Sequence, residues 1–161
     1  IAVPWQAYMA PQFMMLRGMG LNNTHLAIII LQAFSAFGVF MMKQFYEGVP
    51  TELCEASRID GMTEYGIYAK IMLPLAKPAL STLTIFTFVN TWNDFLGPYI
   101  YLTRDGLKTI QLGLRSFIGQ YSSEYGLIMA GSVVTMIPVI AVFLALQKYF
   151  VEGVASTGLK G

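Results

Sequence analysis

The sequence contains little that could support redox chemistry or metal binding. It has one cysteine and one histidine among 161 residues. Because Cys54 has no second cysteine in the sequence, it cannot form an internal disulfide, and with His25 alone there is no Cys/His spacing typical of zinc sites. The residues therefore exclude a disulfide-stabilised domain and a zinc centre, and we predict that this chain binds no metal or cofactor.

Charge is also scarce. Asp, Glu, Lys and Arg make up 12% of the sequence, about half the share in an average soluble domain, while 55% is hydrophobic. The mean hydropathy is +0.57, which is typical of a membrane protein. The net charge of +1 provides no basic surface for nucleic acid, so that class of partner is excluded.

Long uncharged runs predict membrane-spanning helices. Residues 26–42 carry no charge, and 17 residues at 1.5 Å each give about 26 Å, close to the thickness of the hydrocarbon layer. Residues 125–147 form a second run, and residues 78–102 a third, with Asp94 as its one charge and an expected break at Gly97-Pro98. Residues 1–16 are uncharged but contain Pro4 and Pro11, as at the end of a kinked span.

We therefore predict an all-α membrane protein, a polytopic helical bundle with the end of one spanning helix and three full spanning helices. The chain begins at Ile1 inside an apolar run, so we interpret residues 1–161 as one partial transmembrane domain that lacks its N-terminal spans. Residues 103–124 are predicted to form an ordered external loop, and residues 150–161 a short flexible tail.

The polar segment from Pro50 to Pro78 separates two of the apolar runs and contains four of the nine acidic residues. It predicts two short helices. Thr51 is a candidate N-cap for the first, and Gly61 can end it in the left-handed conformation. Thr63 can start the second helix, and Pro74 and Pro78 end it or turn it into the next span.

The first of these helices has a face of small and polar residues. Leu53, Ala56, Ser57 and Asp60 recur at helical spacing, and the small ones would let another surface approach the backbone closely. Glu52 and Glu55 lie in the first turns, where the helix dipole favours an acidic residue. The simplest structural interpretation of these residues is capping and turn formation.

Polar residues within the third run form a stripe. Thr84, Thr87, Thr91 and Asp94 lie at offsets of three, seven and ten residues, on one side of a helix. An ionisable residue at membrane depth marks a transport pathway or a buried pair by default, whereas the threonines can equally pack between helices. Packing between helices is also the preferred role for Gln32 and Ser35 in the preceding run.

The distribution of basic residues indicates the orientation. If the 43–78 segment is cytoplasmic, the tail is cytoplasmic too, which places six basic residues inside and four outside. The six are Lys43, Arg58, Lys70, Lys77, Lys148 and Lys160, and the four are Arg17, Arg104, Lys108 and Arg115. This bias favours a cytoplasmic 50–78 loop.

Two motifs in that loop carry a family resemblance. Glu55-Ala56-Ser57, then Gly61, then Ile71-Met72-Leu73-Pro74 resemble the EAA loop in the permease subunits of ATP-binding-cassette (ABC) importers, with Ser57 in place of the second alanine. The segments FTFVNTWNDFLGPYIYL and QKYFVEGVASTGLKG resemble the carbohydrate-importer branch, in particular subunits similar to the maltose-transporter permease G. The resemblance covers nearly the whole chain.

The resemblance implies a multi-pass permease of a bacterial or archaeal cytoplasmic membrane, with no catalysis of its own. Its coupling helix, about Thr51–Gly61 here, would dock on a separate ATPase subunit that uses ATP and Mg²⁺. Glu55 and Asp60 would belong to the docking surface, Ala56 and Ser57 would allow close approach, and Gly61 would form the turn. The other implied partners are a second permease subunit, an extracytoplasmic sugar-binding protein and the lipid bilayer.

For the sugar path, the resemblance points to the end of the third run. The implied residues are Thr87, Asn90, Thr91, Trp92, Asn93 and Asp94. Trp92 could stack on a sugar ring and the amides could bind hydroxyl groups. Trp92 could equally be an anchor at the membrane interface.

Three other functions remain open from the sequence. The first is an ABC importer permease for a solute other than a sugar. The second is a proton-coupled carrier that uses Asp94 and His25, which would leave the 50–78 loop unexplained. The third is an intramembrane enzyme, for which we find no paired catalytic groups, and no phosphate-binding Gly-x-x-x-x-Gly-Lys-Ser/Thr motif is present either.

Overall fold

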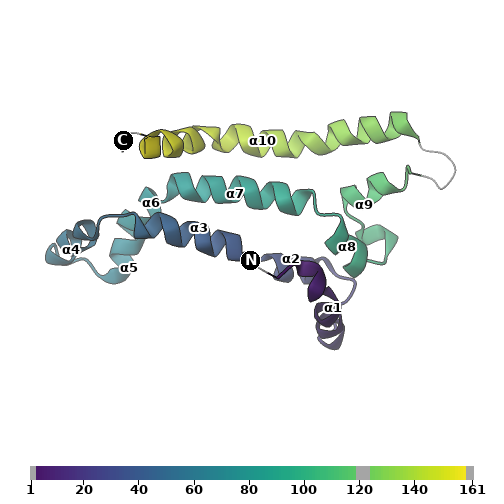
Figure 1. Ribbon diagram of the computed structural model, residues 1–161, viewed down its shortest axis with the longest axis horizontal. Helices are drawn as coiled ribbons and strands as arrows, with labels where there is room; N and C mark the ends of the chain where they lie inside the picture. Colours follow the sequence, from purple (N-terminus) through teal and green to yellow (C-terminus); the bar gives the residue numbers. More distant parts are fainter. Residues whose placement is uncertain (1–2, 119–123, 159–161) are drawn as a thin grey trace. The chain divides into compact units, whose positions relative to one another are not determined.

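The computed structural model describes residues 3–118 and 124–158, with side chains described as far as residue 149. Every regular element in these ranges is helical, as the composition predicts (Figure 1). In chain order the elements are η1 (Trp5–Ala7), α1 (Met9–Gly18), α2 (His25–Gln32), α3 (Ala36–Glu47), α4 (Thr51–Ile59), α5 (Glu64–Ile67), η2 (Tyr68–Met72), α6 (Leu73–Leu75), α7 (Lys77–Trp92), α8 (Leu96–Tyr101), η3 (Asp105–Leu107), α9 (Ile110–Arg115) and α10 (Tyr125–Gly158).

The chain divides into two compact units. The first contains residues 1–35 and 88–141, and the second contains residues 36–87 and 142–161. Helices α7 and α10 each run through both units.

The first unit packs around its N-terminal segment. Leu16, Ala27 and Tyr101 are buried together, and Trp5 and Phe13 pack against them. Helix α2 begins at His25 after the N-cap Thr24, whose side chain accepts a hydrogen bond from the amide of Ala27 at 3.3 Å. The first unit thus joins α1, α2 and α8 through one small apolar core.

The span predicted over residues 26–42 is interrupted. Helix α2 ends at Gln32 and α3 begins at Ala36, although the stretch His25–Glu47 as a whole is long and apolar enough to cross a membrane. Nothing in the residue types at positions 33–35 explains this break.

The break in the third run lies earlier than predicted. Helix α7 ends at Trp92 and α8 begins at Leu96, so Gly97 and Pro98 lie inside α8 rather than between helices. The amide of Gly97 donates to Oδ1 of Asp94 at 3.1 Å, and Pro98 has no amide hydrogen to satisfy in the first turn. Asp94 precedes the N-cap Phe95 and accepts from an amide in the first turn of α8, and Pro98 is compatible with the helix start.

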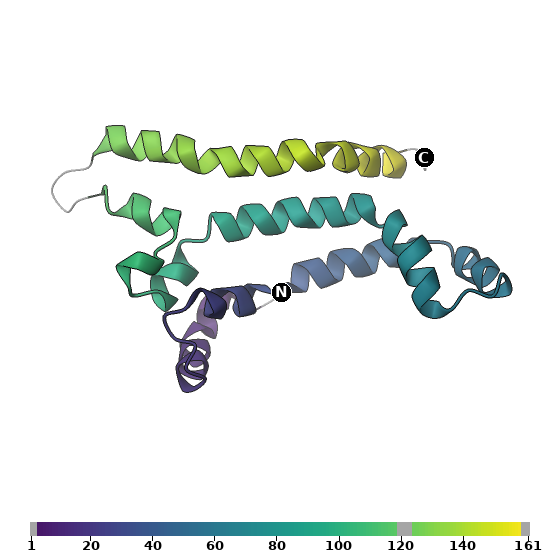
Figure 2. The same cartoon turned by 180° about the vertical axis from the view of Figure 1, so that it is seen from behind.

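In the second unit, α3 and the first part of α7 run side by side in both views (Figures 1 and 2). The rings of Phe37 and Phe86 meet edge to face between them, with centroids 6.0 Å apart. At the start of α7 the chain bends by 68° between Glu64–Leu75 and Lys77–Trp92. The bend follows Pro74 and lies next to the buried Ala76, so the polar segment turns into the next helix as predicted.

The residues before Pro74 form a π-helical turn, η2, instead of a continuous α-helix. In a regular α-helix the ring of Pro74 would clash with the carbonyl of the residue four positions earlier. The wider π-helical turn from residue 68 to residue 72 shifts that carbonyl relative to the ring of Pro74. The helix can therefore continue into α6.

Two stretches, His25–Glu47 and Tyr125–Tyr149, are long and apolar enough to cross a membrane, or three if the bent pair is one span. Helix α1 has 10 residues, too few to cross a bilayer by itself. Helix α10 continues through Gly158, so most of the tail predicted to be flexible is helical.

Candidate functional site

The polar loop of the second unit forms a stiff helix–turn–helix. Helix α4 ends at Ile59 with Asp60 as its C-cap, and the next residue, Gly61, has a φ of +79° in the left-handed region. The amide of Met62 donates to the carbonyl of Ser57, and the amide of Gly61 to that of Arg58, both at 3.0 Å. These two bonds form a Schellman motif, which fixes the exit direction of the chain and requires a residue that tolerates positive φ.

An ion pair closes the same turn. Nε of Arg58 lies 2.6 Å from Oε1 of Glu64, and Nη2 lies 3.2 Å from Oε2. The hydrogen bond from Arg58, together with its charge, lowers the pKa of the Glu64 carboxyl below its ordinary value of 4.5. Both groups are exposed, so the pair orients α5 relative to α4 more than it stabilises the whole chain.

The start of α4 differs from the prediction. Pro50 occupies the N-cap position with no side-chain hydrogen bond, and Thr51 is the first helical residue rather than the cap. Thr63 does cap α5 as predicted, because its hydroxyl accepts from the amide of Gly66 at 3.2 Å. Pro50 fits before a helix start because its φ is already close to the helical value.

The structure divides the predicted coupling residues between two faces of the loop. Glu55, Ala56, Asp60 and Gly61 are exposed, whereas Ser57 is 5% exposed. The hydroxyl of Ser57 donates to the carbonyl of Leu53 at 2.6 Å. Ser57 therefore does not lie on an exposed docking face with Ala56, because that turn of α4 packs inward.

The inward face continues one turn earlier. The thiol of Cys54 lies 3.8 Å from the sulfur of Met72 in η2, and Ile67 of α5 is buried. Cys54 and Ser57 are three residues apart, on one side of α4. The outward face instead carries large apolar groups next to the turn, with Ile59 87% and Tyr65 89% exposed.

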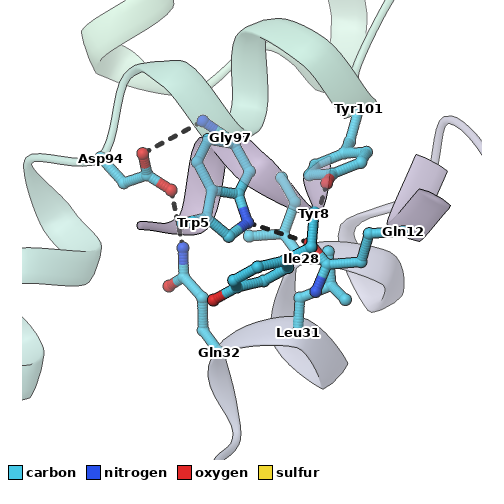
Figure 3. Close-up of a pocket in the computed structure, with 9 residues that line it drawn as sticks. All are labelled: Trp5, Tyr8, Gln12, Ile28, Leu31, Gln32, Asp94, Gly97 and Tyr101. Atoms are coloured by element: carbon cyan, nitrogen blue, oxygen red, sulfur yellow. Dashed lines mark hydrogen bonds between the residues drawn. The ribbon is translucent and has the colours of Figure 1, made fainter. Parts of the chain in front are cut away.

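A second polar cluster lies in the first unit, at the break between α7 and α8 (Figure 3). Oδ1 of Asp94 accepts from the amide of Gly97, and Oδ2 accepts from Nε2 of Gln32 at 2.7 Å. Gly97 is required for this arrangement, since a Cβ there would lie 2.5 Å from Oδ2 of Asp94. Asp94 lies two residues beyond the end of α7, so the predicted stripe along one helix is limited to the three threonines.

This cluster borders a cavity of about 230 Å³. Its polar and aromatic lining consists of Trp5, Tyr8, Gln12, Gln32, Asp94 and Tyr101 (Figure 3). The indole N–H of Trp5 and the hydroxyl of Tyr101 both donate to Oε1 of Gln12, at 2.9 and 3.0 Å. Residues far apart in the sequence thus converge on one hollow.

The other predicted path residues do not line this cavity. The indole N–H of Trp92 donates to the carbonyl of Thr135 in α10 at 3.0 Å, and its ring stacks on Phe88 at 5.7 Å. Oδ1 of Asn93 accepts from Gln111 at 3.2 Å. Trp92 therefore ties two helices together and has one ring face covered. Thr87, Asn90 and Thr91 are exposed on α7.

Four of the polar and aromatic lining residues were not singled out from the sequence: Trp5, Tyr8, Gln12 and Tyr101. Gln12 is a polar residue in an apolar N-terminal run, which is the one local signal that could have drawn attention to it. Among the side chains that the structure describes, those of residues 3–118 and 124–149, no group of three or more His, Cys, Asp and Glu could hold a metal ion.

Comparison with known proteins adds family evidence. Residues 1–156 match the family described as binding-protein-dependent transport system inner membrane component. The chain is 38% identical, over 161 residues, to the arabinooligosaccharides transport system permease protein AraQ of Halalkalibacterium halodurans. It is 37% identical over 153 residues to the lactose transport system permease protein LacG of Rhizobium radiobacter. These alignments cover 100% and 95% of this chain.

A solved structure shares the fold. It is the crystal structure of a bacterial ABC transporter involved in the import of the acidic polysaccharide alginate, with a TM-score of 0.77 and 29% sequence identity. The match covers 91% of this chain and 57% of that one. The two permease relatives are likewise covered over 58% and 56% of their lengths, so the chain spans somewhat more than half of the proteins it resembles.

Proposed function

Because the chain belongs to the family of binding-protein-dependent transport system inner membrane components, we propose that it forms part of a saccharide permease in the cytoplasmic membrane of a bacterium or archaeon. Members of this family are membrane components of transport systems and not enzymes. The observation that carries the proposal is the similarity along the whole chain to permeases named for arabinooligosaccharides and lactose.

The α4–α5 loop is the part we assign to energy coupling. In this proposal α4 docks on a separate ATPase subunit, which binds ATP and Mg²⁺. The support is local: Glu55, Ala56 and Asp60 are exposed, and the Schellman turn at Gly61 makes the loop rigid. A rigid loop can transmit a push from its partner to α7, whereas a flexible one would absorb it.

The roles of the coupling residues differ. Glu55 and Asp60 provide charged contacts on the docking surface, and Ala56 lets the partner approach α4 closely. Gly61 fixes the turn, and Ser57 contributes from inside the loop by letting α4 pack closely on its own neighbours. Ile59 and Tyr65 add apolar area to the docking surface.

If the α4–α5 loop is cytoplasmic, the side of the membrane on which each remaining segment lies is fixed. We place residues 50–78 and 150–161 on the cytoplasmic side and residues 103–124 on the external side, facing a sugar-binding protein. A second permease subunit completes the translocation path, to which Thr87, Asn90 and Thr91 of α7 contribute an exposed polar face. Asn93, Trp92 and Asp94 contribute by holding the end of α7 in place.

The proposal is tested with the full-length permease assembled with its partner subunits in proteoliposomes. Uptake and ATP hydrolysis are measured with arabinotriose, lactose and raffinose, and with digalacturonate as an acidic saccharide. We expect at least one neutral saccharide to be taken up with ATP consumption. Uptake that collapses with an uncoupler while ATP stays high would instead indicate a proton-coupled carrier.

Coupling is tested separately with Glu55→Lys and Gly61→Pro. Both should insert and assemble normally but lower saccharide uptake about tenfold or more relative to ATP hydrolysis, because reversing a docking charge or breaking the turn weakens transmission. Arg17→Glu is the control for a charge reversal, since Arg17 is exposed on α1 and lies outside both the 50–78 and the 103–124 segments. Normal uptake in both loop variants would eliminate the lever model.

A further inference from the structure

A second cavity of the first unit is lined by positive charge. It has a volume of about 420 Å³ and lies beside α8 and α9. Lys108 and Arg115 line it and are both exposed, whereas Leu102 and Leu112 are buried and close its apolar floor. None of the acidic side chains that the structure describes belongs to the lining. The cavity therefore offers accessible cations above an apolar base.

The two cations are neutralised to different degrees. Nζ of Lys108 forms an ion pair with Oδ1 of Asp105 at 2.6 Å. None of the ion pairs among the described side chains involves Arg115, whose Nη1 donates to the carbonyl of Ile118 at 3.4 Å. Two cations beside one carboxylate leave a single positive charge in excess. This charge is complementary to a ligand group with one negative charge.

The packing of α9 on α10 sets the depth of this cavity in a bilayer. Leu114, the residue before Arg115, packs so closely on Gly131 that a Cβ there would overlap Cδ2 of Leu114. Gly131 lies six residues (131 − 125) into α10, about 9 Å along the helix axis. Both views show α9 beside the first turns of α10 (Figures 1 and 2). Because Tyr125–Tyr149 is long and apolar enough to cross a membrane, Arg115 lies near one end of a span, at the level of the lipid headgroups.

An anion at this depth is most readily supplied by the membrane itself. Lysine and arginine near the bilayer surface attract anionic lipids, and basic pockets between spanning helices hold their headgroups. Tyr99 lines the same cavity and is 63% exposed, and tyrosine is enriched at the headgroup level because its ring is amphipathic. A water-soluble acidic partner would have to enter the headgroup layer to reach the same cations, whereas a phospholipid is already there.

We propose that this cavity binds the headgroup of an anionic phospholipid, whose phosphodiester contacts Lys108 and Arg115. A guanidinium group binds phosphate through paired N–H donors, and the ammonium group adds a point charge. The phosphodiester carries the one negative charge that the cavity lacks. In the topology proposed above, this lipid belongs to the external leaflet. The inference needs α10 to span a membrane and does not depend on which solute is transported.

The test uses the full-length permease assembled with its partner subunits in nanodiscs of equal parts phosphatidylcholine and phosphatidylglycerol. After extraction with detergent, the lipids that stay bound are counted by native mass spectrometry. We expect the double variant Lys108→Gln/Arg115→Gln to lose one retained phosphatidylglycerol per copy of this chain. Arg104→Gln is the matched control: Arg104 is exposed in the same segment and does not line the cavity, so its removal should leave the count unchanged.

Arg115→Gln alone replaces the double variant if the latter does not assemble, and it should give the same loss, because the remaining Lys108 is paired with Asp105. Equal phosphatidylglycerol counts in the wild type and the cavity variant would overturn the site, as would an equal loss in Arg104→Gln. Retention of phosphatidylcholine at this site would overturn its preference for an anionic lipid. An unchanged lipid count with weaker capture of the extracytoplasmic binding protein would also overturn it, and would assign the two cations to an acidic protein surface.

Discussion

Arg58 and Glu64 form a two-bond ion pair across the turn at Gly61, with Nε–Oε1 and Nη2–Oε2 distances of 2.6 and 3.2 Å. The pair joins the last turn of α4 to the first residue of α5. Together with the Schellman bonds, it gives the loop one defined angle between its helices.

The pH dependence of this pair has a definite sign. Because the hydrogen bond from Arg58 lowers the pKa of Glu64 below 4.5, the pair stabilises the turn at neutral pH. Its contribution is lost as the pH falls through the lowered pKa. The carboxyl carbon of Glu64, followed by NMR in the solubilised protein, should titrate below the usual glutamate range and return toward 4.5 in Arg58→Gln. Identical titration curves in the two proteins would contradict the pairing.

Replacing each of the adjacent small residues Ala56 and Ser57 of α4 by leucine should affect different properties, coupling for Ala56 and stability for Ser57. Ser57→Leu puts bulk into a buried position and should lower the free energy of unfolding by about 1–3 kcal/mol. Ala56→Leu, on the exposed side, should change it by less than about 0.5 kcal/mol yet reduce coupling, because the larger side chain obstructs docking. Denaturant titration gives the first quantity and the ratio of uptake to ATP hydrolysis the second. Equal destabilisation by both substitutions would mean that α4 is turned differently.

The features that the sequence predicts correctly are local. The turn at Gly61 and the cap at Thr63 each depend on contacts within a few residues, so turn and capping chemistry is sufficient to identify them. The long apolar runs predict helices for the same reason, because length and composition alone define them. The two-helix form of the 50–78 loop is likewise predicted from local signals.

The predictions that were wrong depend on contacts between residues that are distant in the sequence. Gln32 and Asp94 are 62 residues apart, and their hydrogen bond cannot be read from spacing. The inward position of Ser57 depends on how α4 packs against η2, which the contact between Cys54 and Met72 shows. Gly97-Pro98 is a strong breaker signal, but α8 begins before it, at Leu96, and Asp94 accepts from the amide of Gly97 in the first turn.

Gly97 should be intolerant of a side chain. A Cβ at this position would lie 2.5 Å from Oδ2 of Asp94, so Gly97→Ala must displace the carboxylate and weaken its bond to Gln32. We expect the free energy of unfolding to fall by about 1–3 kcal/mol, the range for a lost hydrogen bond to a charged group. Gly113→Ala is the control, since a Cβ there would meet nothing within 4 Å.

A double substitution separates this clash from a general effect of alanine in α8. In an Asp94→Ala background the obstructing carboxylate is gone, so Gly97→Ala should cost much less than in the wild type. Additive costs in the double variant would show that Gly97 does not act through Asp94.

Trp92 should act as a link between helices and not as a sugar-stacking residue. Its indole N–H donates to the carbonyl of Thr135 in α10, next to Val134, whose carbonyl has no helical donor because Pro138 lacks an amide hydrogen. Trp92→Phe keeps a ring to stack on Phe88 but loses this bond, so the free energy of unfolding should fall by about 0.5–1.5 kcal/mol with the KM for uptake unchanged. A raised KM at unaltered stability would place the sugar against Trp92, because a residue that only joins α7 to α10 has no means of changing affinity without changing the fold.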